Sequence, residues 1–523
     1  MSQMLKSSGA MGVATLASRI LGMVREMFYS HFMGDTPVAS AFKLAFQIPN
    51  LFRRLLGEGA LTVAFIPIFK QKERVAGEVE MWRAANAVIS GLVIASAVII
   101  GLAMLGITVA LSVHAFEENT RLMLRLLRLM FPYMLMVCLA AIFMGMLNAR
   151  GHFFIPAMGA AVLNIVLISS VVFLAPNWGS SLETQIFGLA IGVLAAGAAQ
   201  AIFQWPNLRR EGFRYAWVSP WRNETVREVV RNMLPGTMGV AAFQINVLVT
   251  YGVAYSVDDH IVASFDYAVR LMELPQGIFG ISLATYLLPT LSGLAADKKF
   301  PEFRTTLGQG LSHLVFLNLI ASVLLVILAE PIIRLIFEHG KFTAASTHRA
   351  ALALSCLAPG LVAFSMVNIL ARAFYALGDT KTPMRISIVC LGLNLVFALI
   401  VVWPLRQAGL GLANSLSATF NVGLLLYALR GKLKFLDTTE LRRSIGPLLI
   451  AAFFSGIAAW SARHFWDKSI GHENIAKKIG AVFAPMAMAS LIYFSLAWWM
   501  NVPSAREILN LIWEKSGLRP WKK

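Results

Sequence analysis

The chain has 523 residues, of which 58% are hydrophobic and only 14% are charged, and its mean hydropathy is +0.69. A composition this apolar excludes a water-soluble globular protein, because most of the length has to be solvated by lipid. The formal net charge of +18 would suggest a nucleic-acid partner in a soluble protein. In a membrane chain the basic residues report topology first, so no nucleic-acid partner is expected.

Sparsely charged stretches recur along the chain, each long enough to cross the hydrocarbon core of a bilayer, which takes roughly 20 residues. They predict an all-α polytopic membrane protein with about fourteen transmembrane helices. The first stretch contains Arg19 and Arg25 and lacks a small-residue cleavage site, so we interpret it as a retained helix and not as a signal peptide. The expected spans are 10–33, 38–68, 84–113, 122–147, 156–175, 185–206, 230–255, 263–292, 307–336, 347–376, 384–403, 408–430, 445–463 and 479–501.

Lys and Arg are concentrated at both ends of the chain and in the loops that follow even-numbered spans. The loop 207–229 alone contains Arg209, Arg210, Arg214, Arg222 and Arg227, whereas loops after odd-numbered spans, such as 256–260, are short or acidic. The positive-inside rule therefore predicts that both termini are cytoplasmic and that the number of spans is even.

A weak internal repeat relates two segments. Residues 148–156 (NARGHFFIP) and 375–383 (YALGDTKTP) match at Ala, Gly and Pro. Segments that recur in this way predict two related lobes of six spans in the same orientation. The expected domains are residues 1–229, residues 230–443, and a final part, 444–523, with spans thirteen and fourteen and a basic tail.

Several charged residues fall inside the expected spans, where a central Arg costs roughly 2.5–3.5 kcal/mol and therefore faces a counter-ion or a water-filled cavity. Local pairing at helical spacing, such as Arg19 with Glu26 or Arg270 with Glu273, is one interpretation. An excess of cations that binds an anionic ligand through paired N–H donors is the other. The first, second and eighth spans together hold Arg19, Arg25, Lys43, Arg53, Arg54 and Arg270 against Glu26, Glu58, Asp266 and Glu273.

The residues that enzyme chemistry needs are missing from the sequence. No Walker-type phosphate loop is present, and the nine histidines lack metal-ligand spacing. Cys138, Cys356 and Cys390 lie inside apolar stretches with no paired spacing. We therefore expect no enzyme activity, no cofactor and no metal site.

Residues 18–26 (SRILGMVRE), 49–60 (PNLFRRLLGEGA), 267–277 (YAVRLMELPQG), 340–343 (GKFT) and 374–383 (FYALGDTKTP) resemble motifs of the MurJ/MviN family, the lipid II flippases of the MOP exporter superfamily. The resemblance covers nearly the whole chain in order. It implies fourteen helices, with two six-helix lobes in a V around a central cationic cavity and a lipid-tail groove in spans thirteen and fourteen.

The resemblance also implies a function. The substrate would be lipid II, undecaprenyl-diphosphate carrying a disaccharide-pentapeptide, moved from the cytoplasmic to the periplasmic leaflet of the bacterial inner membrane by alternating access. Membrane lipids are further expected partners, and the cell-wall synthesis machinery is a candidate one. The implied substrate-binding residues are Arg19, Arg25, Glu26, Arg53, Glu58 and Arg270, with Arg54, Asp266 and Glu273 as supporting cavity residues.

Two positions depart from the family pattern: Ser40 stands where many members have Asp, and Gln47 where many have Lys. No role can be assigned to either from the sequence. A flippase for another polyprenyl-diphosphate oligosaccharide, a membrane-embedded cell-wall glycosyltransferase and a scaffold for the cell-wall machinery remain alternatives.

Overall fold

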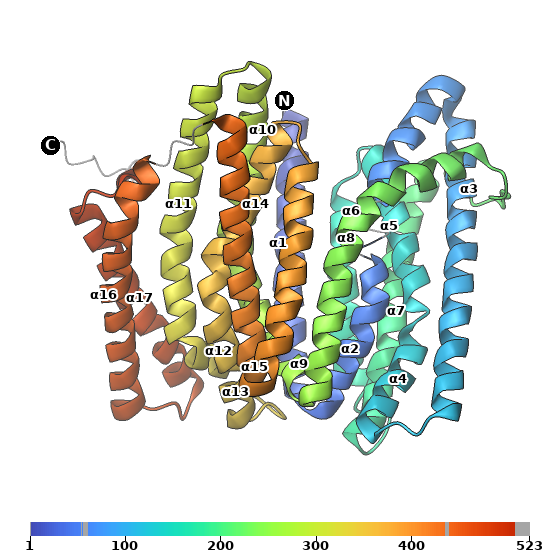
Figure 1. Cartoon of the computed structure of the whole chain (residues 1–523). Helices are drawn as coiled ribbons and strands as arrows, with labels where there is room; N and C mark the ends of the chain where they lie inside the picture. The colour runs from blue at the N-terminus through green and yellow to red at the C-terminus, as the bar shows by residue number, and fades with distance from the viewer. Residues whose placement is uncertain (1, 54, 56–60, 435–438, 508–523) are drawn as a thin grey trace. The chain divides into compact units, whose positions relative to one another are not determined.

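The computed structural model describes residues 2–53, 55, 61–434 and 439–507. In these residues every regular element is a helix and no strand is present (Figure 1). The chain divides into two compact units. Unit 1 is Met1–Ala263 with His339–Phe342, and unit 2 is Ser264–Glu338 with Thr343–Lys523.

The helices of unit 1 run in chain order from α1 to α8. They are α1 (Ser2–Met33), α2 (Pro37–Phe52), α3 (Leu61–Val113), α4 (Glu118–Met130), α5 (Tyr133–Ala149), α6 (Phe154–Ser169), which continues as the π-helical turn η2 (Ser170–Leu174), α7 (Leu182–Arg210) and α8 (Glu224–Val257). Within α3 the backbone is non-helical at Gly77, with φ 85°. This break separates the end of the second expected span from the third.

Unit 2 has the same all-helical character. The first of its helices, α9 (Ile261–Pro275), begins with residues 261–263 of unit 1. The elements that follow are the π-helical segment η3 (Gln276–Ile281), α10 (Ser282–Ala296), α11 (Phe300–Ile327), α12 (Ala329–Phe337), α13 (Ala344–Leu357), the short η4 (Ala358–Gly360), α14 (Leu361–Ala376), α15 (Lys381–Leu433), α16 (Thr439–Ser469) and α17 (Ile475–Trp499). α15 is broken at Arg406, where φ is 49°. α16 and α17 pack on each other and on α11 and α12.

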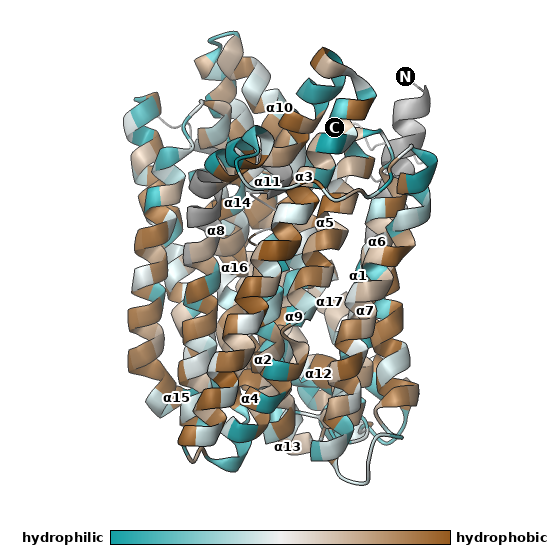
Figure 2. Ribbon diagram, turned by 90° about the vertical axis from the view of Figure 1, so that its right-hand side faces the viewer, coloured by the Kyte–Doolittle hydropathy of each residue, from teal (hydrophilic) through white to brown (hydrophobic). Residues whose placement is uncertain are grey.

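Many helices expose apolar side chains, which is the pattern of a protein solvated by lipid. Figure 2 shows apolar residues along the middle of the helices and hydrophilic ones gathered toward their ends. In the described part of the chain, nine helices are long and apolar enough to cross a membrane, or ten when the bent pair α4 and α5 counts as one span. The prediction of an all-α polytopic membrane protein is confirmed; α3 and α15 each cover parts of two expected spans, and the number fourteen stays a prediction.

The eighth expected span, which contains Pro275, Gly277 and Gly280, is irregular. α9 ends at Pro275, and the chain continues as the π-helical η3 before α10 begins. A Cβ atom on Gly280 would lie 2.6 Å from the Ser365 hydroxyl oxygen of α14. Gly280 therefore permits a close approach of η3 to α14, and a larger residue there would force the two apart.

The internal repeat is visible in the backbone hydrogen bonds of the two matching loops. Gly151 has φ 89° and Gly378 has φ 74°. The next residue in each loop donates its N–H back across the turn: His152 to the carbonyl of Leu147, and Asp379 to that of Phe374, each at 2.9 Å. Both loops thus end a helix with a left-handed glycine, the usual C-terminal cap. The lobe boundaries expected from the sequence stay a prediction.

Candidate functional site

Arg25 is the centre of a charged cluster inside unit 1. From α1, its guanidinium donates to the side-chain oxygen of Asn164 on α6 at 2.9 Å and to a carboxylate oxygen of Glu26 at 2.5 Å. The guanidinium carbon also lies 5.5 Å from the ring centroid of Tyr29, a cation–π distance. The side chain of Arg25 is only 15% exposed, so its direction is set by packing and by these partners.

Glu26 is buried and contacts two cations. Besides the Arg25 contact, its second carboxylate oxygen lies 3.5 Å from the ammonium nitrogen of Lys43 on α2. The side chains of Glu26 and Lys43 are 4% and 7% exposed. Glu26 therefore lies between a cation of its own helix and one of α2.

Sequence reasoning missed Asn164. Its amide nitrogen donates to the backbone carbonyl of Ser18 at 3.2 Å while its oxygen accepts from Arg25. A Cβ atom on Gly22 would lie 3.8 Å from that nitrogen, so α6 approaches α1 over a residue without a side chain. The sequence shows a single Asn in an otherwise apolar stretch, and this alone does not predict which residue it contacts.

The other expected residues of unit 1 are arranged differently. Arg19 is exposed, and the ion pairs of Glu26 that the described residues show go to Arg25 and Lys43 instead. Arg53 is half-buried and donates to the Asn50 side chain at 2.8 Å. Arg54 and Glu58 lie outside the described residues.

In unit 2, Arg270 is held between two acids on its own helix. Its guanidinium lies 3.1 Å from a carboxylate oxygen of Glu273 and 4.0 Å from one of Asp266. These are the i,i+3 and i,i+4 neighbours, so helical spacing alone explains the pairing. In this cluster one cation contacts two carboxylates, whereas around Glu26 one carboxylate contacts two cations.

Arg372, on α14, supports the irregular segment of the same unit. It donates to the carbonyl of Ile281 at 3.1 Å. Irregular helices leave backbone carbonyls without a helical donor, and a neighbouring side chain commonly supplies one. Arg372 therefore stabilises the irregular segment by supplying a hydrogen-bond donor to its backbone.

Ser40, one of the two positions expected to depart from the family pattern, has a structural contact. It is fully buried, and its hydroxyl oxygen accepts the backbone N–H of Ala263 at 3.1 Å. Nearby, a ring nitrogen of His260 lies 2.7 Å from the carbonyl oxygen of Asp35. Within unit 1, these contacts join His260 to the connection between α1 and α2, and Ala263, at the start of α9, to α2.

The chain resembles known proteins over most of its length. A family model described as lipid II flippase MurJ matches residues 29–477. The chain belongs to the MurJ family. A Haemophilus influenzae protein named probable lipid II flippase MurJ is 31% identical over 470 residues, 85% of this chain and 90% of the relative. The lipid II flippase MurJ of Burkholderia cenocepacia is 30% identical over 497 residues, 93% and 95% of the two chains.

Solved structures support the same fold. A structure titled lipid II flippase MurJ, inward closed conformation, matches with a TM-score of 0.77 at 23% identity, covering 93% of this chain and 97% of that one. An inward-facing multidrug resistance transporter of the MATE family matches with a TM-score of 0.66 at 15% identity, over 80% and 95%. Because MurJ proteins are named as flippases, the family is one of transporters and not of enzymes.

Proposed function

We propose that this chain flips lipid II. The substrate would be undecaprenyl-diphosphate carrying the peptidoglycan precursor, moved from the cytoplasmic to the periplasmic leaflet of the bacterial inner membrane. Membership of the MurJ family supports the substrate class. The positive-inside distribution of Lys and Arg supports an orientation with both termini in the cytoplasm.

The observation that carries the proposal is membership of the MurJ family, and the cations around Glu26 are of the kind that binds a diphosphate. A diphosphate is recognised by guanidinium groups through paired, charge-assisted hydrogen bonds. The Arg25 guanidinium is already oriented by Asn164 and Glu26, so little side-chain entropy would be lost on binding. Lys43 adds a second positive charge to the same buried group.

We assign the remaining expected residues to the same function. Arg19, Arg53 and Arg270 would contact the headgroup as it moves, with Asp266 and Glu273 keeping Arg270 in place. Glu58 and Arg54 belong to the same proposal by their sequence motif. The movement would be alternating access, and the membrane potential would help to reset it, since each elementary charge moved through 100 mV is worth about 2.3 kcal/mol.

The test is lipid II exposure on the outer leaflet in cells whose native flippase is depleted. Arg25→Ala and Arg270→Ala should each lower exposure at least tenfold at normal protein level and normal lipid II synthesis, while Arg25→Lys should retain part of it. Arg209→Ala, which removes an exposed cation at the end of α7, is the matched control and should leave exposure unchanged.

Two outcomes would overturn the proposal. Full exposure with both Arg25→Ala and Arg270→Ala would exclude these charges from transport and favour a scaffold. Normal lipid II exposure after depletion of the wild-type protein, together with loss of another polyprenyl-diphosphate sugar, would assign the chain to a different lipid-linked substrate.

A further inference from the structure

Three arginines lie along one face of α4 in unit 1. Arg121, Arg125 and Arg128 stand at i, i+4 and i+7, so their side chains share one side of the helix. Arg121 and Arg125 are exposed, and Arg128 is half-buried. α4 follows α3 through the connection 114–117 and packs beside it (Figure 1). None of the three arginines contributes to the Arg25 cluster described above.

The helices around this row contain few acids. α4 packs on α2, α3 and α7. α2 has no Asp or Glu, and neither has α3 after Glu80 or α4 after Glu118. The acids at this end of unit 1 stand at or just before the start of a helix: Asp35, Glu117, Glu118, Glu183, Asp258 and Asp259.

Arg125 and Arg128 lie beyond those acids. Arg121 is three residues after Glu118 and so remains close to the acidic helix start, whereas Arg125 and Arg128 are about two and three turns further along than Glu118. None of the described residues forms an ion pair with either of them. The connection 114–117 follows an odd-numbered span, where the positive-inside rule expects few cations. This pair of cations therefore needs a partner from outside the chain.

Arg128 is oriented by a neutral partner on α3. Its guanidinium donates to the Thr108 hydroxyl at 3.2 Å, and that hydroxyl donates to the carbonyl of Met104 at 2.7 Å. A guanidinium has five N–H donors, and no carboxylate of the described residues accepts from this one. An oriented guanidinium with donors left over suits a phosphate, which accepts charge-assisted hydrogen bonds from Arg.

An apolar stripe of α3 runs on from the Thr108 contact. Leu102, Leu105 and Val109 are 66%, 62% and 50% exposed, and their spacing places them on one side of the helix. Side chains exposed in this way on a membrane helix are covered by lipid chains. A cationic pair beside such a stripe matches a phospholipid, with its phosphate on the arginines and an acyl chain along α3.

The depth of the pair fits the phosphate layer of a bilayer. Thr108 is five residues before the end of α3 at Val113, about 7–8 Å along the helix axis. The headgroup region on each side of the hydrocarbon is about 5–8 Å thick. Arg128, bonded to Thr108, therefore lies near the boundary between headgroups and hydrocarbon, where the lipids that solvate α3 carry their phosphates.

We propose that Arg125 and Arg128 bind the phosphate of an anionic phospholipid in the leaflet at the connection between α3 and α4. An acyl chain of the same lipid lies along the stripe of Leu102, Leu105 and Val109. The proposed orientation of the chain makes this the periplasmic leaflet, and it enters only in that name. The site does not use the Arg25 cluster, so it stands or falls independently of the flippase proposal.

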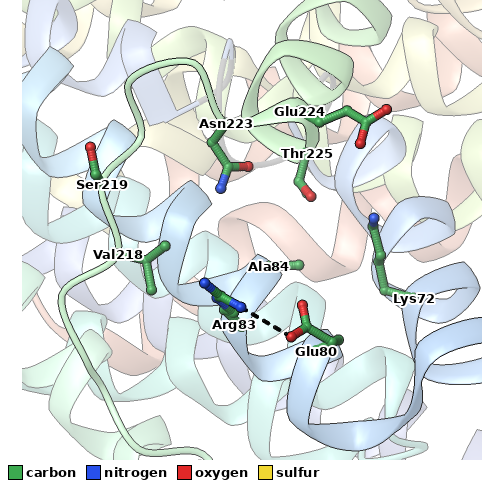
Figure 3. Close-up of a pocket in the computed structure, with 9 residues that line it drawn as sticks. All are labelled: Lys72, Glu80, Arg83, Ala84, Val218, Ser219, Asn223, Glu224 and Thr225. Atoms are coloured by element: carbon green, nitrogen blue, oxygen red, sulfur yellow. Dashed lines mark hydrogen bonds and ion pairs between the residues drawn. The ribbon is translucent and has the colours of Figure 1, made fainter.

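The other end of α3 supplies the matched control. There Arg83 pairs with Glu80 at 3.2 Å, and Lys72 and Glu224 line the same pocket (Figure 3). Arg83 is about 37 Å along the helix from Thr108, and its charge is balanced by a carboxylate of the same lining. Arg83→Gln therefore removes one positive charge from α3 without touching the α4 row.

The test is lipid selection next to α3, measured on the full-length protein in nanodiscs. Val113→Cys, at a position 82% exposed at the end of α3, carries a small fluorophore, and the chain without this change is labelled in parallel as the blank. The fluorophore is quenched by brominated phosphatidylglycerol in one arm and by brominated phosphatidylcholine with the same chains in the other. We expect a preference for phosphatidylglycerol of about tenfold.

The variants should change this preference in a fixed order. Arg125→Gln together with Arg128→Gln should lower it to about twofold or less, whereas Arg125→Lys together with Arg128→Lys should keep most of it, because the charge remains. Arg125→Gln alone changes an exposed residue, so it gives an answer even if the double variant does not fold, and it should lower the preference about threefold. Arg83→Gln should leave it unchanged.

Each contrary result would overturn the site or its occupant. Equal quenching by the two lipids, or a preference that survives the double Gln variant, would exclude the site. An equal loss in Arg83→Gln would mean general attraction by surface charge. Displacement of phosphatidylglycerol by an equal concentration of inorganic phosphate or of undecaprenyl diphosphate would exclude the phospholipid as occupant. Lipid II exposure does not enter the measurement, so a failure here leaves the proposed function untouched.

Discussion

Unit 1 and unit 2 both place an arginine beside carboxylates, but the two clusters are built differently. In unit 1 the side chains of Arg25, Glu26 and Lys43 come from two helices and are 15%, 4% and 7% exposed. In unit 2 Arg270 is paired along one helix, and the side chain of its nearer partner Glu273 is 49% exposed. The first cluster depends on helix packing, whereas the second would form in an isolated helix.

The two clusters also differ in which charge is shared. In unit 1 one carboxylate contacts two cations, whereas in unit 2 one cation contacts two carboxylates. Burial also makes the first cluster more sensitive to change, because a charge that loses its partner in a low-dielectric site is poorly solvated. The predictions below test this contrast, and then the likeness of the two repeat loops.

The largest effect is expected from removing the shared acid of unit 1. Glu26→Gln leaves Arg25 and Lys43 as buried like charges and should lower the free energy of unfolding by about 3–5 kcal/mol. Glu273→Gln is the matched change in unit 2, where Asp266 remains and solvent screens the loss, so it should cost under about 1 kcal/mol. Thermal unfolding of both variants in the same detergent measures the difference.

A second variant keeps this comparison falsifiable. Glu26→Gln combined with Lys43→Met removes one of the two cations and should recover part of the lost stability. Equal shifts of the unfolding midpoint for Glu26→Gln and Glu273→Gln would contradict the contrast between a buried and an exposed cluster.

The sequence predicted the helices well because lipid imposes one requirement on every span. An apolar stretch of the right length has to be helical, since unsatisfied backbone groups are too costly in hydrocarbon. The two breaks inside long helices also fall where the expected spans leave a gap: Gly77, with φ 85°, lies between residues 68 and 84, and Arg406, with φ 49°, lies between residues 403 and 408. The sequence did not predict the backbone conformation at Arg406, because a positive φ is uncommon for a residue other than glycine.

The candidate site was predictable only in part. Arg25 and Glu26 could be chosen as candidates because they are charged residues inside an expected span. Helical spacing, however, predicted that Glu26 pairs with Arg19. On a helix, adjacent residues such as Arg25 and Glu26 do not face each other. Their contact occurs because Asn164 on α6 and Lys43 on α2 fix the two side chains from other directions. Such partners depend on tertiary packing, which one sequence does not reveal.

A medium effect is expected at the glycines of the repeat. Gly151→Ala and Gly378→Ala place a side chain at φ 89° and 74°, which should cost about 1–2 kcal/mol each. Neither position has an atom within 4 Å of a new Cβ, so the cost is that of the backbone alone and should be the same in both units. Chemical or thermal unfolding measures it.

The control for the glycines is Gly101→Ala in α3. A Cβ there also meets nothing within 4 Å, and its φ is not in the left-handed region, so Ala should be neutral or slightly stabilising. Destabilisation by Gly151→Ala but not by Gly378→Ala would contradict the structural equivalence of the two loops.

The smallest effect on stability is expected from removing the ion pairs beside these glycines. The residue after the glycine is a base in unit 1, His152, and an acid in unit 2, Asp379. In unit 1, His152 lies 2.7 Å from Glu211, which also accepts from Arg150 at 2.7 Å. In unit 2, Asp379 accepts from Lys432 at 2.7 Å and also caps the N–H of Thr382 at 3.0 Å. One carboxylate thus ties each loop to the end of a helix, α7 in unit 1 and α15 in unit 2.

Both carboxylates should stabilise the protein with the same pH dependence. Hydrogen bonds from Arg150 and then His152 lower the pKa of Glu211, and those from Lys432 and the Thr382 backbone lower the pKa of Asp379. A lowered folded-state pKa means that the stabilisation is complete above the unfolded-state pKa of the carboxyl group, about 4, and is lost as the pH falls through the folded-state pKa.

Glu211→Gln and Asp379→Asn should therefore each lower the free energy of unfolding by about 0.5–1 kcal/mol at pH 7, and the difference from wild type should shrink below pH 4. Asp379→Asn should have the larger effect, since it also weakens the backbone cap. Unfolding midpoints between pH 7 and 3 measure this, and a difference that stays constant over that range would mean that the loops are not held by these charges.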